Sequence, residues 1–499
     1  MGVPTVDWLA VAPALLPAGG AVVVLALDAA IGRGRAPRVL GGIGVASILA
    51  ALVTLVPLAS GTRRTFCAAS GSCGWVASHL SFALQLVVLV SALVTLLLAL
   101  ADLGTGWSDV DRPARPLAEL LVLVLTATAG ATALAAARDL ATFTVALETA
   151  SLPLVGLVAV RRDARGAEAG VKLLLTAVLS FGLLTLGVAL LYASTGSLFL
   201  GARVSEQLGD LAVVHGLGLA LVVAGAAFKL SLVPFHLWTP DTYAGAPLPV
   251  AAFLSTVSKA AGLTAVVVVL AVGAPERSSV WAAPVGVLAV VTMTVGNLVA
   301  LRQDGAVRLL AWSTVAQAGW VLLPLAGAVG HGRVPGAVSA SVAYLLAYVT
   351  ATVTAFAVVA RTARVHRDGD RHRLSAYAGL WREQPALALV LAFALVCLAG
   401  LPPGVMGLVA KVVAIVPVVG VEAWWLVAFA VVNVVLGVAV YLRWAVQVFS
   451  PRADGEPVVD APRTPLTGRL ALSLAAAGCV ALSVLPEGLI GLLAGAPLH

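Results

Sequence analysis

Long apolar runs limit the fold of this 499-residue chain more than any other feature of its sequence. We count about 14 stretches of 18 or more mostly apolar residues, each long enough to cross a hydrocarbon core about 30 Å thick. Because lipid offers the backbone no hydrogen-bonding partners, such stretches cross a membrane as helices. With only 11% charged residues, a soluble domain is excluded, and the sequence predicts an all-α polytopic membrane protein. The predicted spans are 9–30, 38–59, 79–100, 116–136, 139–160, 171–192, 211–233, 247–271, 281–300, 306–327, 336–360, 385–417, 422–446 and 468–494.

Arginines between the runs predict how the helices are oriented. Of the 26 arginines, 20 follow odd-numbered runs and 6 follow even-numbered runs. Cytoplasmic loops carry the excess of basic residues, so both termini are predicted to face outward. Scattered over short loops, the arginines form no basic domain of the kind that binds nucleic acid.

Four cysteines divide into two pairs by their surroundings. Cys67 and Cys73 fall in a predicted outward loop, where a disulfide is allowed; the paired and the free states both stay open at this point. Cys397 and Cys479 lie in apolar runs and are expected to serve as packing residues.

Two of the runs are interrupted by residues that a continuous helix avoids. One interruption surrounds Pro234, and the other is Gly400-Leu-Pro-Pro-Gly404. Proline removes a backbone donor and clashes with the preceding turn, although in many membrane helices it only produces a kink. For each interruption taken alone, a simple kink stays an open alternative.

The interruptions fall at matching places in the order of the runs. If runs 4 to 8 form one five-helix unit and runs 9 to 13 another, the broken helix is the fourth in both. Since five is odd, the second unit starts from the opposite face, and such inverted repeats are typical of ion-coupled transporters. The predicted divisions are 1–115 for helices 1 to 3, 116–271 for the first repeat, 281–446 for the second, inverted repeat, and 447–499 for the C-terminal loop and helix 14.

All four lysines of the chain lie inside apolar runs, and they are Lys172, Lys229, Lys259 and Lys411. Glu148 lies in the middle of the fifth run. Arginine keeps its proton, whereas a lysine among apolar groups can release one. At an effective dielectric of ~20, moving two unit charges from ~8 Å to ~4 Å changes their energy by roughly 2 kcal/mol, which is sufficient to move a proton. The pattern therefore predicts a proton relay inside the membrane.

Each candidate also has a structural interpretation. Lys172 is near enough to the end of its run to reach the headgroups by snorkelling. Glu148 could belong to a purely structural ion pair. His236, beside Pro234, is either a relay residue or a hydrogen-bonded structural histidine, and Asp241 either caps a half-helix or lies near an access path.

Motifs for metals and cofactors are absent from the sequence. It contains no paired-cysteine motif, no His-Glu-x-x-His, no glycine-rich phosphate loop and no haem motif. We therefore expect no metal site, no cofactor-binding site and no redox centre in this chain.

Several long motifs resemble those of one family, the antiporter-like subunits of respiratory complex I, and most of all its subunit N type. The principal motif is Phe228-Lys-Leu-Ser-Leu-Val-Pro-Phe-His-Leu-Trp-Thr-Pro-Asp-Thr-Tyr-Ala-Gly-Ala-Pro247, followed by Phe253-Leu-Ser-Thr-Val-Ser-Lys259. Glu148-Thr-Ala-Ser-Leu-Pro-Leu154 and Leu309-Leu-Ala-Trp-Ser-Thr-Val-Ala-Gln-Ala-Gly-Trp320 are similar to two further motifs of that family. The family usually has Gly-Phe-Phe-Gly-Lys before its last lysine, where this chain has Met406-Gly-Leu-Val-Ala-Lys411.

What the resemblance implies is a proton-translocating membrane-arm subunit of NADH:quinone oxidoreductase, multi-pass in a bacterial inner or plasma membrane. Its partners would be the other membrane-arm subunits and the lipid bilayer. NAD, FMN, iron-sulfur clusters and quinone would belong to partner subunits. Residue by residue, it implies that Glu148 pairs with a lysine, that Lys172 and Lys229 work in a first half-channel, that Lys259 connects, and that Lys411 serves a second half-channel.

Related families keep a second interpretation open. Cation/proton antiporter subunits of the Mrp type and antiporter-like subunits of membrane hydrogenases share much of the core motif. The Tyr243-Ala-Gly-Ala-Pro247 form and the pair Ser258-Lys259 favour the complex I interpretation.

Overall fold

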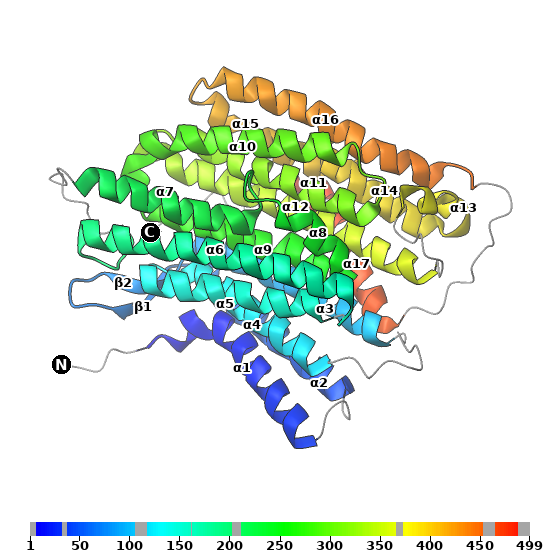
Figure 1. Cartoon of the computed structure of the whole chain (residues 1–499), viewed down its shortest axis with the longest axis horizontal. Helices are drawn as coiled ribbons and strands as arrows, with labels where there is room; N and C mark the ends of the chain where they lie inside the picture. Colours follow the sequence, from blue (N-terminus) through cyan, green and yellow to red (C-terminus); the bar gives the residue numbers. More distant parts are fainter. Residues whose placement is uncertain are drawn as a thin grey trace.

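The chain folds into a bundle of membrane-length helices, seen from the side in Figure 1. In this computed structural model, the described residues are 6–31, 37–104, 117–160, 162–201, 211–365, 373–452 and 465–487. Among them are 13 helices long and apolar enough to cross a membrane. Two shorter helices, α14 and α15, together form one further, interrupted crossing, so the prediction of about 14 spans is confirmed.

Most predicted spans correspond to one helix each. The helices are α1 (Trp8–Ile31), α2 (Pro37–Leu55), α3 (His79–Gly104), α4 (Leu117–Ala136), α5 (Leu140–Ala159), α6 (Ala164–Thr195), α7 (Leu211–Leu230), α8 (Trp238–Gly245), α9 (Leu248–Val267), α10 (Ser278–Ala300), α11 (Ala306–Leu322), α12 (Val334–Val365), α13 (Leu380–Glu383), α14 (Pro385–Ala399), α15 (Val405–Val419), α16 (Trp424–Phe449) and α17 (Leu466–Val484). Short 3-10 turns cover Val56–Leu58, Pro275–Arg277, Leu323–Gly327, His331–Arg333 and Leu374–Tyr377, and a π turn, Val268–Val272, continues α9.

Both predicted interruptions are true breaks between helices. Residues 231–237 separate α7 from α8, and residues 400–404 separate α14 from α15. Each break contains a cis X-Pro bond, Val233-Pro234 in the first and Pro402-Pro403 in the second. The simple-kink alternative is therefore wrong for both.

The predicted first repeat contains helices α4 to α9 and the predicted second repeat contains helices α10 to α16, and the packing within the two sets corresponds. The pairs α4 with α5, α5 with α6, α6 with α7 and α7 with α9 recur as α10 with α11, α11 with α12, α12 with α14 and α14 with α16. The contact of α4 with α9 likewise recurs between α10 and α16. Because each repeat crosses the membrane five times, the second begins from the opposite face.

One close approach between helices, present in both repeats, shows which of their residues are equivalent. A Cβ on Gly130 would come within 2.3 Å of the Ala150 backbone nitrogen, and a Cβ on Gly296 within 2.4 Å of the Ala316 nitrogen. In both repeats, only glycine lets the first two helices approach this closely. Ala150 and Ala316 are therefore equivalent positions.

Contacts between loops agree with the predicted alternation of faces. Each contact joins two loops that both follow even-numbered runs or both follow odd-numbered runs, as loops on one face of the membrane do. The contacts are Trp75 with Ala137, Asp139 with Phe199, Gly305 with Arg373, Leu374 with Asp304, and Arg452 with Glu383. Both chain termini lie outside the described residues, so their predicted outward orientation stays a prediction.

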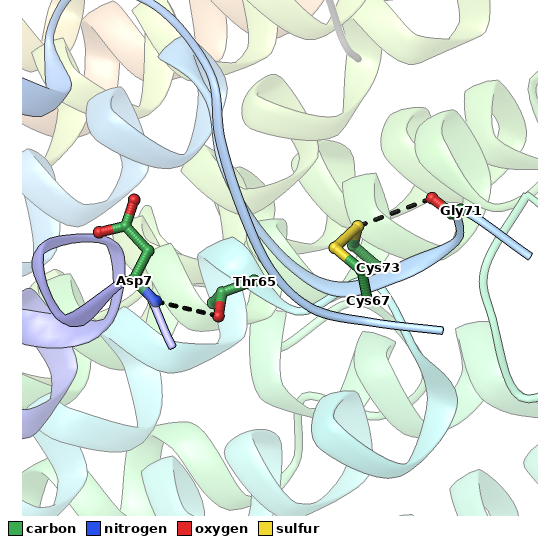
Figure 2. Close-up of a disulfide and its surroundings, with 5 residues drawn as sticks. All are labelled: Asp7, Thr65, Cys67, Gly71 and Cys73. Carbon is green, nitrogen blue, oxygen red and sulfur yellow. Dashed lines mark hydrogen bonds between the residues drawn. A yellow bond between two sulfur atoms is a disulfide. The ribbon is translucent and has the colours of Figure 1, made fainter. Parts of the chain in front are cut away.

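A small β-hairpin, which the all-α prediction missed, covers the ends of the N-terminal helices. Strands β1 (Arg63–Cys67) and β2 (Cys73–Ala77) pair antiparallel, with Cys67 opposite Cys73. These two cysteines form a disulfide, shown in Figure 2, which decides the question left open by the sequence. The free Cys397 and Cys479 are buried, as expected of packing residues.

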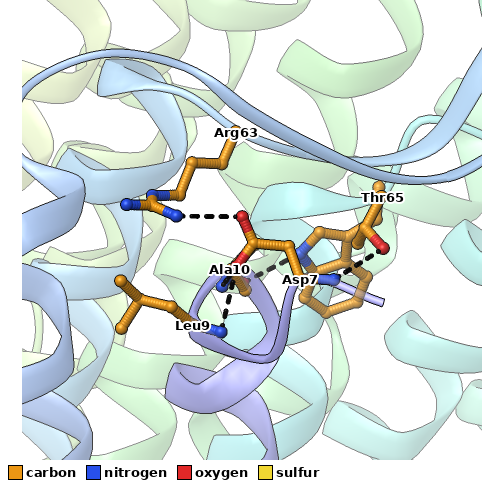
Figure 3. Close-up of polar contacts among 6 residues, drawn as sticks. Asp7, Leu9, Ala10, Arg63 and Thr65 are labelled. Atoms are coloured by element: carbon orange, nitrogen blue, oxygen red, sulfur yellow. Dashed lines mark hydrogen bonds and ion pairs between the residues drawn. The ribbon is translucent and has the colours of Figure 1, made fainter. Parts of the chain in front are cut away.

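Asp7 ties the hairpin to the start of α1 (Figure 3). Its carboxylate accepts hydrogen bonds from the backbone nitrogens of Leu9 and Ala10 and pairs with Arg63 at 3.1 Å, while its own nitrogen donates to Thr65. Burial alone would raise the pKa of Asp7, but the Arg63 guanidinium and the two backbone donors lower it below its ordinary value. The carboxylate therefore caps α1 in its charged form.

Candidate functional site

The first break leaves helical carbonyls without their usual backbone partners. The nitrogen of Val233, which would bond to the carbonyl of Lys229 in a continuous helix, donates instead to Thr292 on α10 at 3.1 Å. The carbonyl of Phe228 keeps one backbone donor, the Ser231 nitrogen at 3.1 Å, and also accepts from the indole nitrogen of Trp238 at 3.1 Å. Side chains therefore help to satisfy the backbone groups at this break, as membrane burial requires.

Lys259, on α9, fills the first break. Its ammonium donates to the carbonyl of Lys229 at 3.1 Å and to the hydroxyl of Ser231, which in turn contacts Thr239 at 2.5 Å. It also lies 4.6 Å from the ring centre of Trp238. Since Lys259 is only 1% exposed, these contacts stabilise an ammonium that is withdrawn from bulk solvent.

Glu148 and Lys229 are two buried groups of opposite charge next to this lysine. They are 9% and 4% exposed, and each acts electrostatically on the other. One carboxylate oxygen of Glu148 has no hydrogen-bond partner, and among the described residues no ion pair within 4.0 Å joins it to Lys229. Lys229 also acts on Lys259, so the structure brings Glu148, Lys229 and Lys259 together as one row. Its members are coupled without being locked in contact.

Lys172 lies apart from this row. Its side chain is 45% exposed and pairs with Asp241 and with Glu168, each at 2.8 Å. Asp241, in the first turn of α8, is also 4.0 Å from Arg308. Asp241 therefore links α6 to the second half of the broken helix, and Lys172 lies at the rim of the bundle.

His236 faces the second repeat instead of the lysines. It is buried within the first break, and its ring centre lies 5.3 Å from that of Trp312 on α11. Its Nδ1 has no hydrogen-bond partner. In the described part of the chain, no hydrogen bond joins His236 to Lys229 or Lys259.

The second break is closed by Lys411 from the second half-helix itself. Because residue 403 is proline, the carbonyl of Ala399 has no helical donor, and the ammonium of Lys411 donates to it. The chain passes close to the lysine at Gly400, where φ is +76° and a Cβ would lie 2.7 Å from the Lys411 side chain. Lys411 is 4% exposed and lies 5.5 Å from the ring centre of Trp320.

Uncharged polar side chains surround this second lysine. Tyr344 donates to Gln317 at 2.5 Å, Gln317 donates to Tyr441 at 2.8 Å, and Tyr441 lies 2.6 Å from Ser313. We call these four residues the tyrosine-glutamine network. Gln317 also donates to the carbonyl of Leu398, the second carbonyl that the break leaves open, at 3.4 Å.

An asparagine pair borders the same region. The amide of Asn297, on α10, donates to the side chain of Asn433, on α16, at 2.9 Å. A Cβ on Gly437 would lie 3.9 Å from Asn297 Oδ1 and 4.0 Å from Lys411 Nζ, so the pair is close to the lysine.

Tyr348 connects the two regions across the repeat boundary. Its hydroxyl donates to the carbonyl of Ser255, one turn before Lys259, at 2.6 Å. It belongs to α12, one turn after Tyr344. Hydrogen-bonding groups therefore continue from the first lysine cluster toward the second.

Sequence reasoning overlooked the tyrosine-glutamine network and the asparagine pair. Gln317 lies in a family-like motif but was given no role of its own, and no role was predicted for Tyr344, Tyr348, Asn297, Asn433 or Tyr441. The available signal was the presence of amide and hydroxyl side chains at the middle of apolar runs, where each must find a partner. Within the described residues, no group of three or more His, Cys, Asp and Glu side chains could hold a metal ion.

Comparison with known proteins identifies the family. The family model described as NADH:quinone oxidoreductase/Mrp antiporter, TM, matches residues 137–437. The NADH-quinone oxidoreductase subunit N 2 of Streptomyces griseus is 41% identical over 97% of this chain and 93% of its own length. The chain belongs to the NADH:quinone oxidoreductase/Mrp antiporter family.

Solved structures agree with this assignment. A chain of respiratory complex I from Thermus thermophilus, solved with bound aureothin, is 32% identical and has a TM-score of 0.77, covering 97% of this chain and 100% of that one. A chain of the Mrp complex from a Dietzia species reaches a TM-score of 0.80 over 97% of this chain and 96% of its own, but at 23% identity it shows a shared fold alone. The resemblance to subunit N and the fold that it implied are confirmed.

Proposed function

We propose that this chain is the subunit N of an NADH:quinone oxidoreductase and translocates protons across the membrane. The single observation that carries the proposal is the row of buried titratable groups placed at two helix breaks. Its long likeness to subunit N relatives supports the same conclusion and makes the other membrane subunits of the complex its partners. A membrane-buried ionisable group is costly and is kept where it moves ions or protons.

The proposed route begins at the rim and runs along the centre of the bundle. Lys172 and Asp241 would lie at the entrance, followed by Glu148, Lys229 and Lys259. Tyr348 and the tyrosine-glutamine network would then connect the first repeat to Lys411. Water molecules would carry the proton wherever two side chains are not in contact.

Glu148 would control the first step. At an effective dielectric of ~20, a change of its distance to Lys229 from ~8 Å to ~4 Å alters their interaction by roughly 2 kcal/mol. Because no direct ion pair holds the two, a small movement of α5 against α7 can make that change. Lys229 would take up a proton when Glu148 approaches and release it when Glu148 withdraws.

The redox chemistry would take place elsewhere in the assembly. We propose that this chain has no redox centre of its own, and that NAD, FMN, iron-sulfur clusters and quinone belong to partner subunits. Energy from quinone reduction would reach Glu148 as a change in position or charge in a neighbouring subunit.

The repeats would be the working units of the pump, with the first spanning residues 116–271 and the second 281–446. Residues 1–115 and 447–499 would support them. With the arginine-rich loops placed in the cytoplasm of a bacterium, both termini and the disulfide-bonded hairpin would face outward.

Measuring proton pumping against quinone reduction tests this proposal. The assembled complex with Lys229→Ala, in sealed vesicles, should lose quinone-linked proton uptake by at least about tenfold, because a buried relay group is missing. The matched control is Leu217→Ala, also on α7 but on its exposed surface, which should pump normally.

Two results would contradict the proposal. One is near-normal pumping by an assembled Lys229→Ala complex. The other is sodium-driven proton exchange by the unmodified protein in the absence of NADH and quinone, which would favour a cation/proton antiporter of the Mrp type instead.

A further inference from the structure

A cavity of about 200 Å³ lies away from the lysine row, where the ends of four helices meet. Its walls come from α3, α12, α14 and α17. Arg361 of α12, Arg469 of α17 and Gln384, which precedes α14, provide its polar groups. These helix ends adjoin the arginine-rich loops, on the face where we place the cytoplasm.

Polar and apolar groups occupy different sides of this cavity. Leu98, Ala357 and Leu387 are buried and form its floor. Arg469 is exposed and Arg361 half-buried, so the two guanidiniums lie at the rim. The lining residues include these two arginines, each of which also has a protein partner.

An apolar track continues from the rim along the outer surface of α17. Leu470 and Leu474 are 45% and 49% exposed, one turn apart, and directly follow Arg469 along the helix. This surface lies at membrane depth, where hydrocarbon chains would cover it.

We propose that this cavity binds the phosphate headgroup of an anionic phospholipid, with its acyl chains along α17. A guanidinium has five donors and binds phosphate through two parallel hydrogen bonds, so each arginine can hold a phosphate oxygen beside any protein partner. Basic pockets between transmembrane helices on the cytoplasmic side suit such headgroups. Free phosphate would fill only the rim and would leave the apolar floor and track unused.

The bound lipid would fasten the C-terminal helix to the second repeat. Helix α17 has a largely exposed surface, and its buried residues contact α3, α12 and α15. A phosphate held by Arg361 and Arg469 would join α12 to α17 at the headgroup level. Lipid would therefore complete an attachment that protein contacts make only in part.

Binding is best measured on the assembled, delipidated complex by native mass spectrometry and by titration. The probes are phosphatidylglycerol, phosphatidylcholine of the same chain length, and inorganic phosphate. Phosphatidylglycerol should bind, with weaker binding at high salt, and the other two probes should not compete. Equal binding of phosphatidylcholine, or tight binding of inorganic phosphate, would overturn the assignment to an anionic lipid.

Substitutions locate the site. Arg361→Gln and Arg469→Gln should each weaken phosphatidylglycerol binding about fivefold, and the double variant about 30-fold, as expected for one surface cation each. The control Arg302→Gln removes an exposed arginine from another loop on the same face and should bind normally.

A second variant keeps both arginines. Leu472→Trp fills the cavity from α17 and should also weaken binding if the lipid enters it. Unchanged phosphatidylglycerol binding in either the double arginine variant or the Leu472→Trp variant would overturn the proposal.

Discussion

In the first repeat, the lysine that closes the helix break comes from the following helix; in the second, it comes from the broken helix itself. Lys259 donates to the carbonyl of Lys229, and Lys411 donates to the carbonyl of Ala399. Both carbonyls have lost their helical donors at a break. In both repeats, a lysine ammonium therefore replaces the missing backbone donor to a carbonyl at the break. The lysine stands at a different sequence position in each repeat.

The surroundings of the two lysines differ in charge. The first repeat has Glu148 within electrostatic reach of Lys229, whereas the described contacts of the Lys411 ammonium are the Ala399 carbonyl and the Trp320 ring. Counting back two residues from the equivalent Ala150 and Ala316 places Thr314 where the first repeat has Glu148. Among the described residues, a carboxylate therefore acts on a lysine of the first repeat and none acts on Lys411, so in the proposed route the second half would respond through neutral groups.

Among the variants that test this difference between the repeats, Glu148→Gln should reduce proton pumping the most. The amide keeps the shape but removes the charge that acts on Lys229, so pumping should fall by at least about tenfold. Thr314→Val, at the equivalent position, should change pumping by less than about twofold, because Thr314 has no charge that could act on a lysine; its hydroxyl donates within its own helix turn and lies beside the hydroxyls of Tyr243 and Tyr348. Proton uptake per quinone reduced measures both. Equal losses in the two variants would break the distinction between the repeats.

Tyr441→Phe should have an intermediate effect. It removes the hydroxyl that joins Ser313 to Gln317 while keeping the buried ring. We expect pumping to slow by about threefold to tenfold, since a buried amide loses a partner worth about 1–2 kcal/mol. Tyr192→Phe, on an exposed part of α6, is the control and should leave the rate unchanged. A normal rate with Tyr441→Phe would mean that the second half of the route does not use this network.

The paired substitution Cys67→Ser with Cys73→Ser should affect stability alone. The disulfide closes a short loop, and its loss should cost about 2 kcal/mol in the hairpin by the chain-entropy estimate. Pumping should be unchanged, because the hairpin packs on the ends of the N-terminal helices, outside both predicted repeats. Thermal unfolding of the purified complex and vesicle pumping measure the two quantities. A pumping loss as large as that of Glu148→Gln would extend the functional region to the hairpin.

Much of the fold could be predicted because membrane crossing leaves strong signals. Apolar runs of sufficient length must be helices, and the matching places of the interruptions at Pro234 and Pro403 indicated the two breaks. The β-hairpin was missed because residues 63–77 are short, polar and stabilised by the disulfide and by Asp7, none of which produces a periodic pattern.

The site could be predicted only as far as charge reveals it. Lysine and glutamate inside an apolar run attract notice, so Glu148, Lys229, Lys259 and Lys411 were found. Position along a run did not reveal which way a helix faces, so the exposed ion pairs of Lys172 were not foreseen. Neutral groups such as Asn297 and Gln317 gave a weaker signal, because amides and hydroxyls also occur at helix contacts that carry no proton.

The most direct test of the central claim replaces a buried and a rim lysine by arginine, which keeps its charge but does not release its proton. In sealed vesicles, the ratio of protons translocated to quinone reduced should fall sharply with Lys411→Arg, because that lysine must exchange a proton. It should stay within about twofold of normal with Lys172→Arg, since arginine can keep the ion pair with Asp241. Normal pumping by an assembled Lys411→Arg complex would contradict a proton-exchanging relay that runs through both repeats.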